Sequence, residues 1–235
     1  PDCRLYNRRC GSPDRNLTIT LMPFYTVLDR FPGVRVALWR LAEDSETLCG
    51  FFPEKSKGVC EKAVGGITAE KRRRERLAAR LLLMRLGQTG DIVYDRHGKP
   101  GIFDESAHIS ISHTQGWVVV AVADRPVGID IETWGKRALK VSERFLGIEE
   151  REMLKCDVPD DVATLLWSAK ESMFKILGIE GVDFAKHLSI SPFRYTLSSG
   201  EARCFEAEEF RSGQNRHFRI YYICLPDFVL TLAVE

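Results

Sequence analysis

The sequence predicts an α+β protein built from two similar halves that follow the same order of elements. A helical pattern from Thr68 to about Leu86 is followed by several strand patterns. After residue 125 the order repeats, with helical segments first and then four or five strands. The turn Asp124-Arg125-Pro126 separates the two series. Because helices followed by strands, twice, indicate two α+β units, we place the halves at residues 22–124 and 125–235.

Length, composition and charge agree with a globular protein of this class. The 235 residues are enough for one large domain or two small ones. Hydrophobic residues make up 44% and charged residues 29%, which is ordinary for a globular protein. The net charge of +1 argues against a protein that binds polyanions over its whole surface. The longest apolar runs reach about seven residues, whereas a membrane helix needs about 20, so no membrane association is expected.

The first 21 residues differ in composition from the rest of the chain. They mix Arg, Asn, Asp, Gly and Pro without a hydrophobic period, and they contain no apolar core that would indicate a signal peptide. We expect residues 1–21 to be a disordered leader, or sequence that precedes the native start.

The seven cysteines, at positions 3, 10, 49, 60, 156, 204 and 224, are scattered along the chain. Their number is odd and no two of them have the C-x-x-C spacing, so the sequence predicts neither a disulfide framework nor a zinc site. A reducing cytoplasm is therefore the expected compartment.

The first half begins with an alternating strand pattern from Val34 to Leu41. Cys49 to Gly66 is rich in loop formers and predicts a loop. Thr68 is the expected N-cap of the helix that follows, and Gly87 ends that helix. Strand patterns then occur at Asp91–Tyr94, Ile102–Phe103, His108–Ser112 and Trp117–Ala123, with a turn at 95–98 and a hairpin loop at 113–116.

The second half begins with a strand from Val127 to Glu132. Leu139 to Lys155 reads as helical with a break at Gly147, and Asp160 to Leu177 predicts an amphipathic helix that ends at Gly178. The clearest of the remaining strands are His217–Cys224 and Phe228–Val234.

The strand Val127–Glu132 carries two carboxylates on one face. Alternation places Asp130 and Glu132 opposite the apolar side chains, about 6.5–7 Å apart along the strand. At an effective dielectric constant near 20 their repulsion is roughly 2–3 kcal/mol, and an oxygen-seeking cation such as magnesium would relieve it. A solvated edge strand with two surface acids is the simpler interpretation of this motif alone.

The helix from Trp167 to Lys175 carries a third acid. Glu171 and Lys175 are four residues apart and share a helix face. One interpretation is an exposed ion pair between these two side chains. The other is that Glu171 binds a metal together with Asp130 and Glu132, while Lys175 faces a phosphate.

A basic segment, residues 70–86, contains seven cations and two carboxylates, which gives it a charge of +5. Such runs are usually solvated helix faces, and few aromatic residues interrupt this one.

Three blocks of sequence occur in order: G-K-P at 98–100 with H-I-S-I-S-H-T at 108–114, V-G-I-D-I-E at 127–132, and W-S-A-K-E-S-M-F-K at 167–175. Together they resemble the Sfp-type family of 4′-phosphopantetheinyl transferases, whose stretches read G-K-P with F-N-I-S-H-S, G-I-D-I-E, and W-S-x-K-E-S-x-x-K. The resemblance covers roughly residues 68–178. Ser110 and Thr114 depart from the family's Asn and Ser, and none of the acids is lost.

The resemblance implies a magnesium-dependent transfer of phosphopantetheine from coenzyme A to a serine of an apo carrier protein, with release of 3′,5′-ADP. It implies a fold of two similar halves with coenzyme A in the cleft between them. Because one chain contains both halves, the protein is expected to work as a monomer. Asp130, Glu132 and Glu171 would hold the metal, and Lys175 would contact the phosphates. Glu171, directly or through a metal-bound water, would take the proton from the carrier serine. Catalytic roles thus fall on Asp130, Glu171 and Lys175.

The resemblance also implies which residues bind coenzyme A and its partner. Lys99, Ser112 and His113 match residues that contact coenzyme A, and the basic helix offers Lys71, Arg74 and Arg80 for the 3′-phosphate. Family members meet their acyl or peptidyl carrier protein after the metal strand, here at Trp134–Lys140, where three cations suit an acidic helix.

Two other functions stay open at this point. The same three acids would serve another magnesium-dependent phosphoryl or nucleotidyl hydrolase. A different class is a basic RNA-binding module built on residues 70–86. The near-neutral net charge and the lack of a known RNA motif argue against nucleic acid as a partner.

Overall fold

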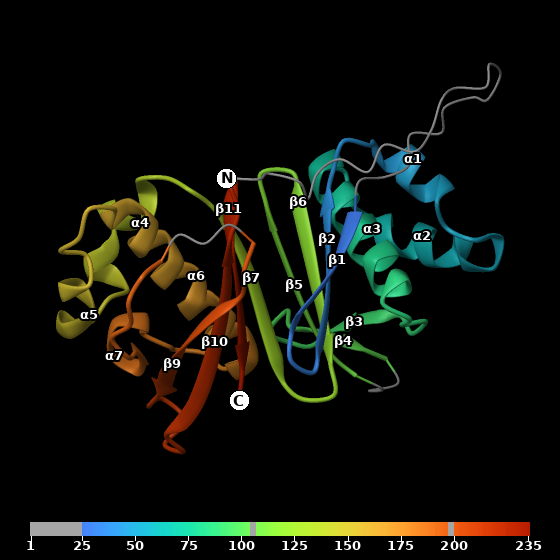
Figure 1. The fold of residues 1–235 in the computed structure, drawn as a ribbon. Helices are drawn as coiled ribbons and strands as arrows, with labels where there is room; N and C mark the ends of the chain where they lie inside the picture. Colours follow the sequence, from blue (N-terminus) through green and yellow to red (C-terminus); the bar gives the residue numbers. More distant parts are fainter. Residues whose placement is uncertain (1–24, 104–106, 197–199) are drawn as a thin grey trace.

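Two antiparallel sheets lie face to face in the middle of the protein, and helices cover the outer face of each sheet (Figure 1). The computed structural model describes residues 25–103, 107–196 and 200–235. The predicted α+β class is confirmed. The segment predicted to be a disordered leader, residues 1–21, lies outside the described residues.

The first sheet has four strands in the order β1-β2-β6-β5. Their bounds are Tyr25–Phe31 for β1, Val34–Arg40 for β2, His108–Thr114 for β5 and Trp117–Ala123 for β6. Alternation in β2 sends Ala37 and Trp39 toward the helices, and Val36 and Leu38 toward the other sheet. The hairpin loop predicted at 113–116 is shorter than expected, because β5 continues to Thr114 and a two-residue turn follows.

Three helical segments precede the long helix α3 (Glu70–Arg85). They are α1 (Ser45–Gly50), a 3-10 turn η1 (Glu54–Ser56) and α2 (Lys57–Val64), so the loop predicted for Cys49–Gly66 is wrong. The predicted cap at Thr68 is also wrong, because α3 begins after Ala69 and no side chain caps it. Instead, the first residue of α3, Glu70, accepts hydrogen bonds from Ser45 N (2.7 Å) and Ser45 Oγ (2.9 Å).

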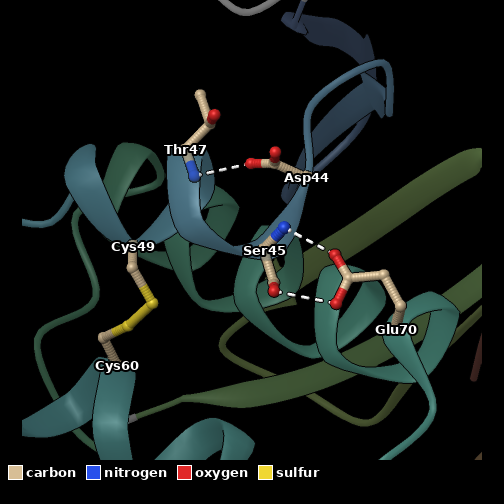
Figure 2. Close-up of a disulfide and its surroundings, with 6 residues drawn as sticks. All are labelled: Asp44, Ser45, Thr47, Cys49, Cys60 and Glu70. Atoms are coloured by element: carbon tan, nitrogen blue, oxygen red, sulfur yellow. Dashed lines mark hydrogen bonds between the residues drawn. A yellow bond between two sulfur atoms is a disulfide. The ribbon is translucent and has the colours of Figure 1, made fainter.

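A disulfide joins α1 to α2 (Figure 2). It links Cys49 and Cys60, whose Cα atoms lie 5.8 Å apart, so the expectation of no disulfide is corrected. The expectation failed because two short helices fold back on each other and bring together cysteines 11 residues apart. On the other side of α1, the bonds from Ser45 to Glu70 connect it to the start of α3. The bridge therefore supports the beginning of the long helix.

The small hairpin β3 (Ile92–Tyr94) and β4 (Pro100–Ile102) forms a two-stranded sheet of its own. The turn predicted at 95–98 lies between these strands, and Gly98 in it has a left-handed φ of 80°. The strand predicted at Ile102–Phe103 is therefore displaced toward the turn, since β4 ends at Ile102.

The second sheet has five strands in the order β7-β11-β10-β9-β8. Their bounds are Val127–Thr133 for β7, Leu188–Ile190 for β8, Arg203–Glu209 for β9, Arg216–Cys224 for β10 and Phe228–Val234 for β11. The helices of this half are α4 (Arg137–Lys140), η2 (Ser142–Arg144), α5 (Ile148–Glu152), α6 (Pro159–Leu177) and α7 (Phe184–His187).

The helix predicted to end at Gly178 is confirmed as α6, and Gly178 has the left-handed φ of 58° that ends many helices. Its apolar face packs on the outer side of the second sheet, as α3 packs on the first. Across the described residues, no helix combines the length and the apolar content that a bilayer crossing requires.

In each half, the strand before the long helix pairs with the last strand of that half. β2 pairs with β6, and β7 pairs with β11. β1, the β3–β4 hairpin and β8 have no such counterparts, and pseudo-twofold symmetry stays a prediction. β6 ends at Ala123 and β7 begins the other sheet at Val127, so the boundary predicted at 124–125 lies in the turn between the sheets.

Candidate active site

The contact between β7 and α6 places the predicted acids. Val127, Ile129 and Ile131 point into the core between the two sheets, as alternation predicted. Gly128 lies on the opposite face, where a Cβ atom would stand 1.9 Å from the backbone oxygen of Ser172 in α6. Only glycine permits so close an approach of helix to strand. Asp130 shares this face and is thereby brought against α6.

Asp130 is the centre of a buried polar network. Asp130 is only 4% exposed. Oδ1 accepts hydrogen bonds from Ser112 Oγ and Lys175 Nζ, each at 2.8 Å, and Oδ2 accepts one from Ser168 Oγ at 2.8 Å. The interpretation of Asp130 as a solvated surface acid is therefore wrong. Ser112 comes from β5 and the other two partners from α6, so the network joins the two halves.

Lys175 does not form the exposed ion pair with Glu171 that was one of the two interpretations of this helix. Its ammonium group donates to Asp130 Oδ1 and to the backbone oxygen of Ile129, at 2.8 and 2.7 Å. These contacts anchor on β7 the cation that was expected to face a phosphate.

Glu132 and Glu171 complete a group of three acids. Glu132 Oε1 accepts a hydrogen bond from Trp167 Nε1 at 3.0 Å, and its pKa is raised by burial first and by the charge of Asp130 second. Burial also raises the pKa of Glu171, to about 7, with the charges of Asp130 and Glu132 adding to the effect and Lys175 opposing it. A carboxyl group with such a pKa can exchange a proton near neutral pH.

The three acids fit magnesium by their chemistry. Carboxylate oxygens are the ligands this cation prefers. Asp130 already accepts three hydrogen bonds, which leaves about one of its four lone-pair positions free. Over the described ranges no three His, Cys, Asp or Glu side chains stand close enough together to hold a metal as they are. To hold one ion, the three carboxylates would therefore have to lie closer together than they do in this structure.

Lys99 is placed at the end of α6. Its Nζ donates to the backbone oxygen of Ile176 at 2.8 Å, and its alkyl chain covers Gly178. Burial lowers its pKa, and the charge of Asp95 opposes that effect. The structure thus connects the β3–β4 hairpin of one half to the last turn of α6 in the other, one residue from Lys175.

His113 lies on the α3 side of β5, on the face opposite Ser112. Its Nδ1 is 3.4 Å from Glu75 Oε1, and Lys71 Nζ is 3.9 Å from the same oxygen. Arg74, on the same helix, donates from Nη2 to the backbone oxygen of Leu41 at 3.0 Å. Lys71 and His113 are therefore brought together through Glu75, a residue that the sequence analysis did not single out.

Arg80 is separated from this group. It lies nine residues after Lys71, which is about half a rotation around the helix. Its Nη1 donates to the backbone oxygen of Arg76, and burial lowers its pKa although Tyr94 opposes the shift. The structure thus does not place Arg80 beside Lys71 as a common phosphate contact.

The sequence analysis did not predict the contacts of the two serines of β5 with β7. Ser110 Oγ accepts a hydrogen bond from the backbone N–H of Ile129 at 3.0 Å, while Ser112 binds Asp130. Both point to the same face because they are two residues apart on a strand. The alternation of side chains along a strand could have identified this pair. That β7 is the strand they contact could not be predicted from the sequence.

Lys170 has a structural place inside the motif helix. It is completely buried, and its Nζ lies 2.6 Å from Glu150 Oε2 and 2.7 to 2.9 Å from the backbone oxygens of Phe145, Phe184 and Leu188. Glu150 also accepts hydrogen bonds from the backbone N–H groups of Gly147 and Ile190. The pair therefore fastens α5, α7 and β8 to α6, and it lies apart from Asp130.

The family model of the 4′-phosphopantetheinyl transferase superfamily matches residues 126–233. Curated relatives are the 4′-phosphopantetheinyl transferases gsp of Aneurinibacillus migulanus (36% identical over 87 residues), psf-1 of Bacillus pumilus (38% over 106 residues) and Sfp of Bacillus subtilis strain 168 (40% over 83 residues). The alignments cover 36%, 43% and 34% of this chain, and 36%, 43% and 37% of the relatives. The chain thus spans less than half the length of the curated relatives it matches.

The matched segment contains both β7 and α6, and with them Asp130, Glu132, Glu171 and Lys175. It also contains the buried pair of Lys170 and Glu150. The predicted resemblance to Sfp-type 4′-phosphopantetheinyl transferases is therefore confirmed, and the superfamily match falls on the part of the chain that carries the acids.

Proposed function

We propose that this protein transfers the 4′-phosphopantetheine group of coenzyme A to a serine hydroxyl of an apo carrier protein and releases 3′,5′-ADP. The observation that carries the proposal is the network around Asp130, in which Ser112 and Lys175 meet one buried carboxylate beside two further acids. Such a site offers oxygen ligands for a cation and a proton acceptor within one short stretch of structure. Family members named as transferases of this group support the same activity.

Asp130, Glu132 and Glu171 would hold magnesium, which when bound neutralises the charge of the coenzyme A pyrophosphate. Glu171 would take the proton from the attacking serine, directly or through a water molecule. Lys175 orients Asp130 and presents positive charge to the phosphates. Ser112 fixes the other side of the same carboxylate oxygen.

On the α3 side, Lys71, Arg74 and His113 would bind the 3′-phosphate of coenzyme A. All three come from one end of the first half, and Arg74 Nε is buried without a hydrogen-bond partner among the described residues. Lys99 would act indirectly by holding the end of α6, from which Lys175 extends.

The partner we propose is an acidic carrier protein that docks on Trp134–Lys140. Lys136, Arg137 and Lys140 are exposed there, and α4 displays two of them. Trp134 is fixed by a hydrogen bond from its Nε1 to the backbone oxygen of Leu225 at 2.7 Å. Cations around a fixed aromatic residue suit an acidic helix. We propose further that the enzyme works as a monomer.

The activity is tested by incubating the protein with coenzyme A, magnesium and an apo acyl carrier protein, and by measuring the intact mass of the carrier. The expected result is a gain of one phosphopantetheine group, with 3′,5′-ADP in solution. Replacing magnesium by chelator, or the carrier serine by alanine, should abolish the gain.

Two results would overturn the proposal. Cleavage of coenzyme A without a change in carrier mass would indicate a magnesium-dependent hydrolase. Binding of RNA through α3, without any effect of coenzyme A, would indicate a nucleic-acid-binding module.

A further inference from the structure

One acid stands out in the basic helix α3. Glu75 is flanked by Arg74 and Arg76, yet its side chain is only 14% exposed, whereas those of Lys71 and His113 are 77% and 53% exposed. Its carboxylate lies between the two more exposed groups, 3.9 Å from Lys71 Nζ and 3.4 Å from His113 Nδ1. An acid that is tucked under two partners of this kind is well placed to orient them.

We propose that Glu75 is a positioning residue that holds the imidazole of His113 in the orientation that binds the 3′-phosphate of coenzyme A. The inference rests on the proposed function, because it takes coenzyme A to be the ligand. Glu75 itself does not touch the ligand. It acts through His113, whose Nδ1 lies 3.4 Å from the Glu75 carboxylate.

The chemistry of imidazole supports this role. With Nδ1 directed to a carboxylate, the ring can rotate little, and Nε2 is left as the group that faces outward. An imidazole protonated at both nitrogens is a donor at each, so Nε2–H can bind a phosphate oxygen while Nδ1–H is held.

The surroundings of Glu75 keep its charge from opposing an anionic ligand. Lys71 lies one turn earlier on the same helix face, and Arg74 is the residue immediately before Glu75. The local charge of Lys71, Arg74, Glu75 and a protonated His113 is positive. The orphaned Nε of Arg74 adds a donor that the described residues leave unused.

The test is a double-mutant cycle on Glu75 and His113 in the full-length protein. Glu75→Ala is expected to raise the KM for coenzyme A about tenfold, as loss of a group that orients a ligand-binding histidine does, with kcat within about twofold of wild type. Glu75→Gln keeps an acceptor oxygen and should recover most of the affinity. In a His113→Ala background, Glu75→Ala should have no further effect, because the two residues act as one unit. Glu61→Ala, an exposed acid on α2, is the matched control.

A second measurement does not depend on the reaction. The ring nitrogens of His113 in 15N-labelled protein should shift in Glu75→Gln, with the resonance assigned by its loss in His113→Ala. Equal weakening by Glu75→Ala in both backgrounds, or an unchanged His113 spectrum, would overturn the positioning role. A wild-type protein that does not bind coenzyme A, while the His113 spectrum still responds to Glu75→Gln, would overturn the proposed function instead.

Discussion

At the scale of single residues, the site depends on the different surroundings of three acids, all of which lie in the second half of the protein. Asp130 accepts hydrogen bonds from three donors, one of which is the ammonium group of Lys175. Glu171 has only Lys175 to favour its ionised form, against burial and two other acids. From the difference between these environments we propose that Asp130 organises the site and that Glu171 exchanges the proton.

Glu171→Gln tests this division through stability as well as activity. The pKa of Glu171 is about 7 in the folded protein and 4.5 without its surroundings. The folded state therefore binds this proton more tightly than the unfolded state, and stability falls as pH rises from about 4.5 to 7. Above pH 7, metal-free Glu171→Gln should be more stable than wild type by about 1–3 kcal/mol, and below pH 4.5 the difference should vanish.

Urea unfolding in chelator at pH 4.5 and pH 8 gives both values, with the exposed Glu149→Gln as a control. The Glu171→Gln enzyme should also lose about 10²–10³ of its turnover. A variant that turns over like wild type, or that gains no stability at pH 8, would contradict the role given to Glu171.

Lys170 illustrates the opposite case, a motif residue whose work is structural. Lys170→Met should cost about 3–5 kcal/mol of unfolding free energy, because Glu150 is left as a buried, unpaired charge. Combining it with Glu150→Gln should restore much of that loss, since the remaining amide carries no charge. Equilibrium denaturation of the single and double variants measures the effect. Additive losses would show that the two side chains do not depend on each other.

The sequence predicted the residues of the site better than their contacts. Alternation on a strand was enough to place Asp130 and Glu132 on one face, away from Ile129 and Ile131. It could not predict that Lys175 bonds Asp130 rather than Glu171, because that choice depends on the distance between a helix and a strand. Lys170 and Glu75 were missed for the same reason, since each owes its role to a partner from another element.

At the scale of elements, the closest approach is that of β7 to α6. Gly128→Ala would put a methyl group only 1.9 Å from the backbone oxygen of Ser172, which is much closer than two non-bonded atoms can stand. The helix would have to move away, and the bonds from Ser168 and Lys175 to Asp130 would lengthen. We expect a loss of about 3 kcal/mol or more, at the upper end for overpacking, together with loss of activity.

The matched control is Gly135→Ala, where nothing lies within 4 Å of the added atom. Thermal unfolding followed by circular dichroism compares the two variants. If Gly128→Ala were as stable as Gly135→Ala, the tight contact between strand and helix would not be required.

The bridged helices α1 and α2 give a second prediction at this scale. Reduction of the bond between Cys49 and Cys60 should lower the unfolding free energy by about 2–4 kcal/mol, as expected for a short closed loop. Cys49→Ser should reproduce the loss without reductant and make reductant ineffective. Alkylation of Cys156 and Cys204, which are exposed and free, should leave stability unchanged. Equal sensitivity of wild type and Cys49→Ser to reductant would contradict the prediction.

Long elements with a clear period were predicted well, and short ones were not. The helix ending at Gly178 and the strand Phe228–Val234 have the predicted bounds to within a residue. The helices within 49–66 were missed because turn-forming residues outweigh the few apolar positions, Phe52, Cys60 and Ala63, that are buried there. Their helical form depends on packing and on the disulfide, and neither is a local property of the sequence.

At the scale of the whole molecule, the two halves meet in two ways. Apolar faces of both sheets form one core between them, which includes Leu38, Val119, Ile129 and Leu230. At one edge of this core, polar bonds cross from half to half: Ser112 to Asp130, the Ile129 N–H to Ser110, and Lys99 to the backbone oxygen of Ile176. The sequence predicted two series of elements. It could not predict how the two halves contact each other, because the hydrogen bonds between them join residues 18 to 77 positions apart.

The shared core determines how the molecule can be divided. Residues 124–126 form the single covalent passage between the sheets, and Asp124 and Arg125 are exposed there. A chain cut at this point would lose no hydrogen bond of the Asp130 network, yet each fragment alone would present an apolar sheet face to water. The halves are therefore better understood as obligate partners than as independent domains: two fragments of this kind would reassemble a complete site when produced together, and either one without the other would aggregate.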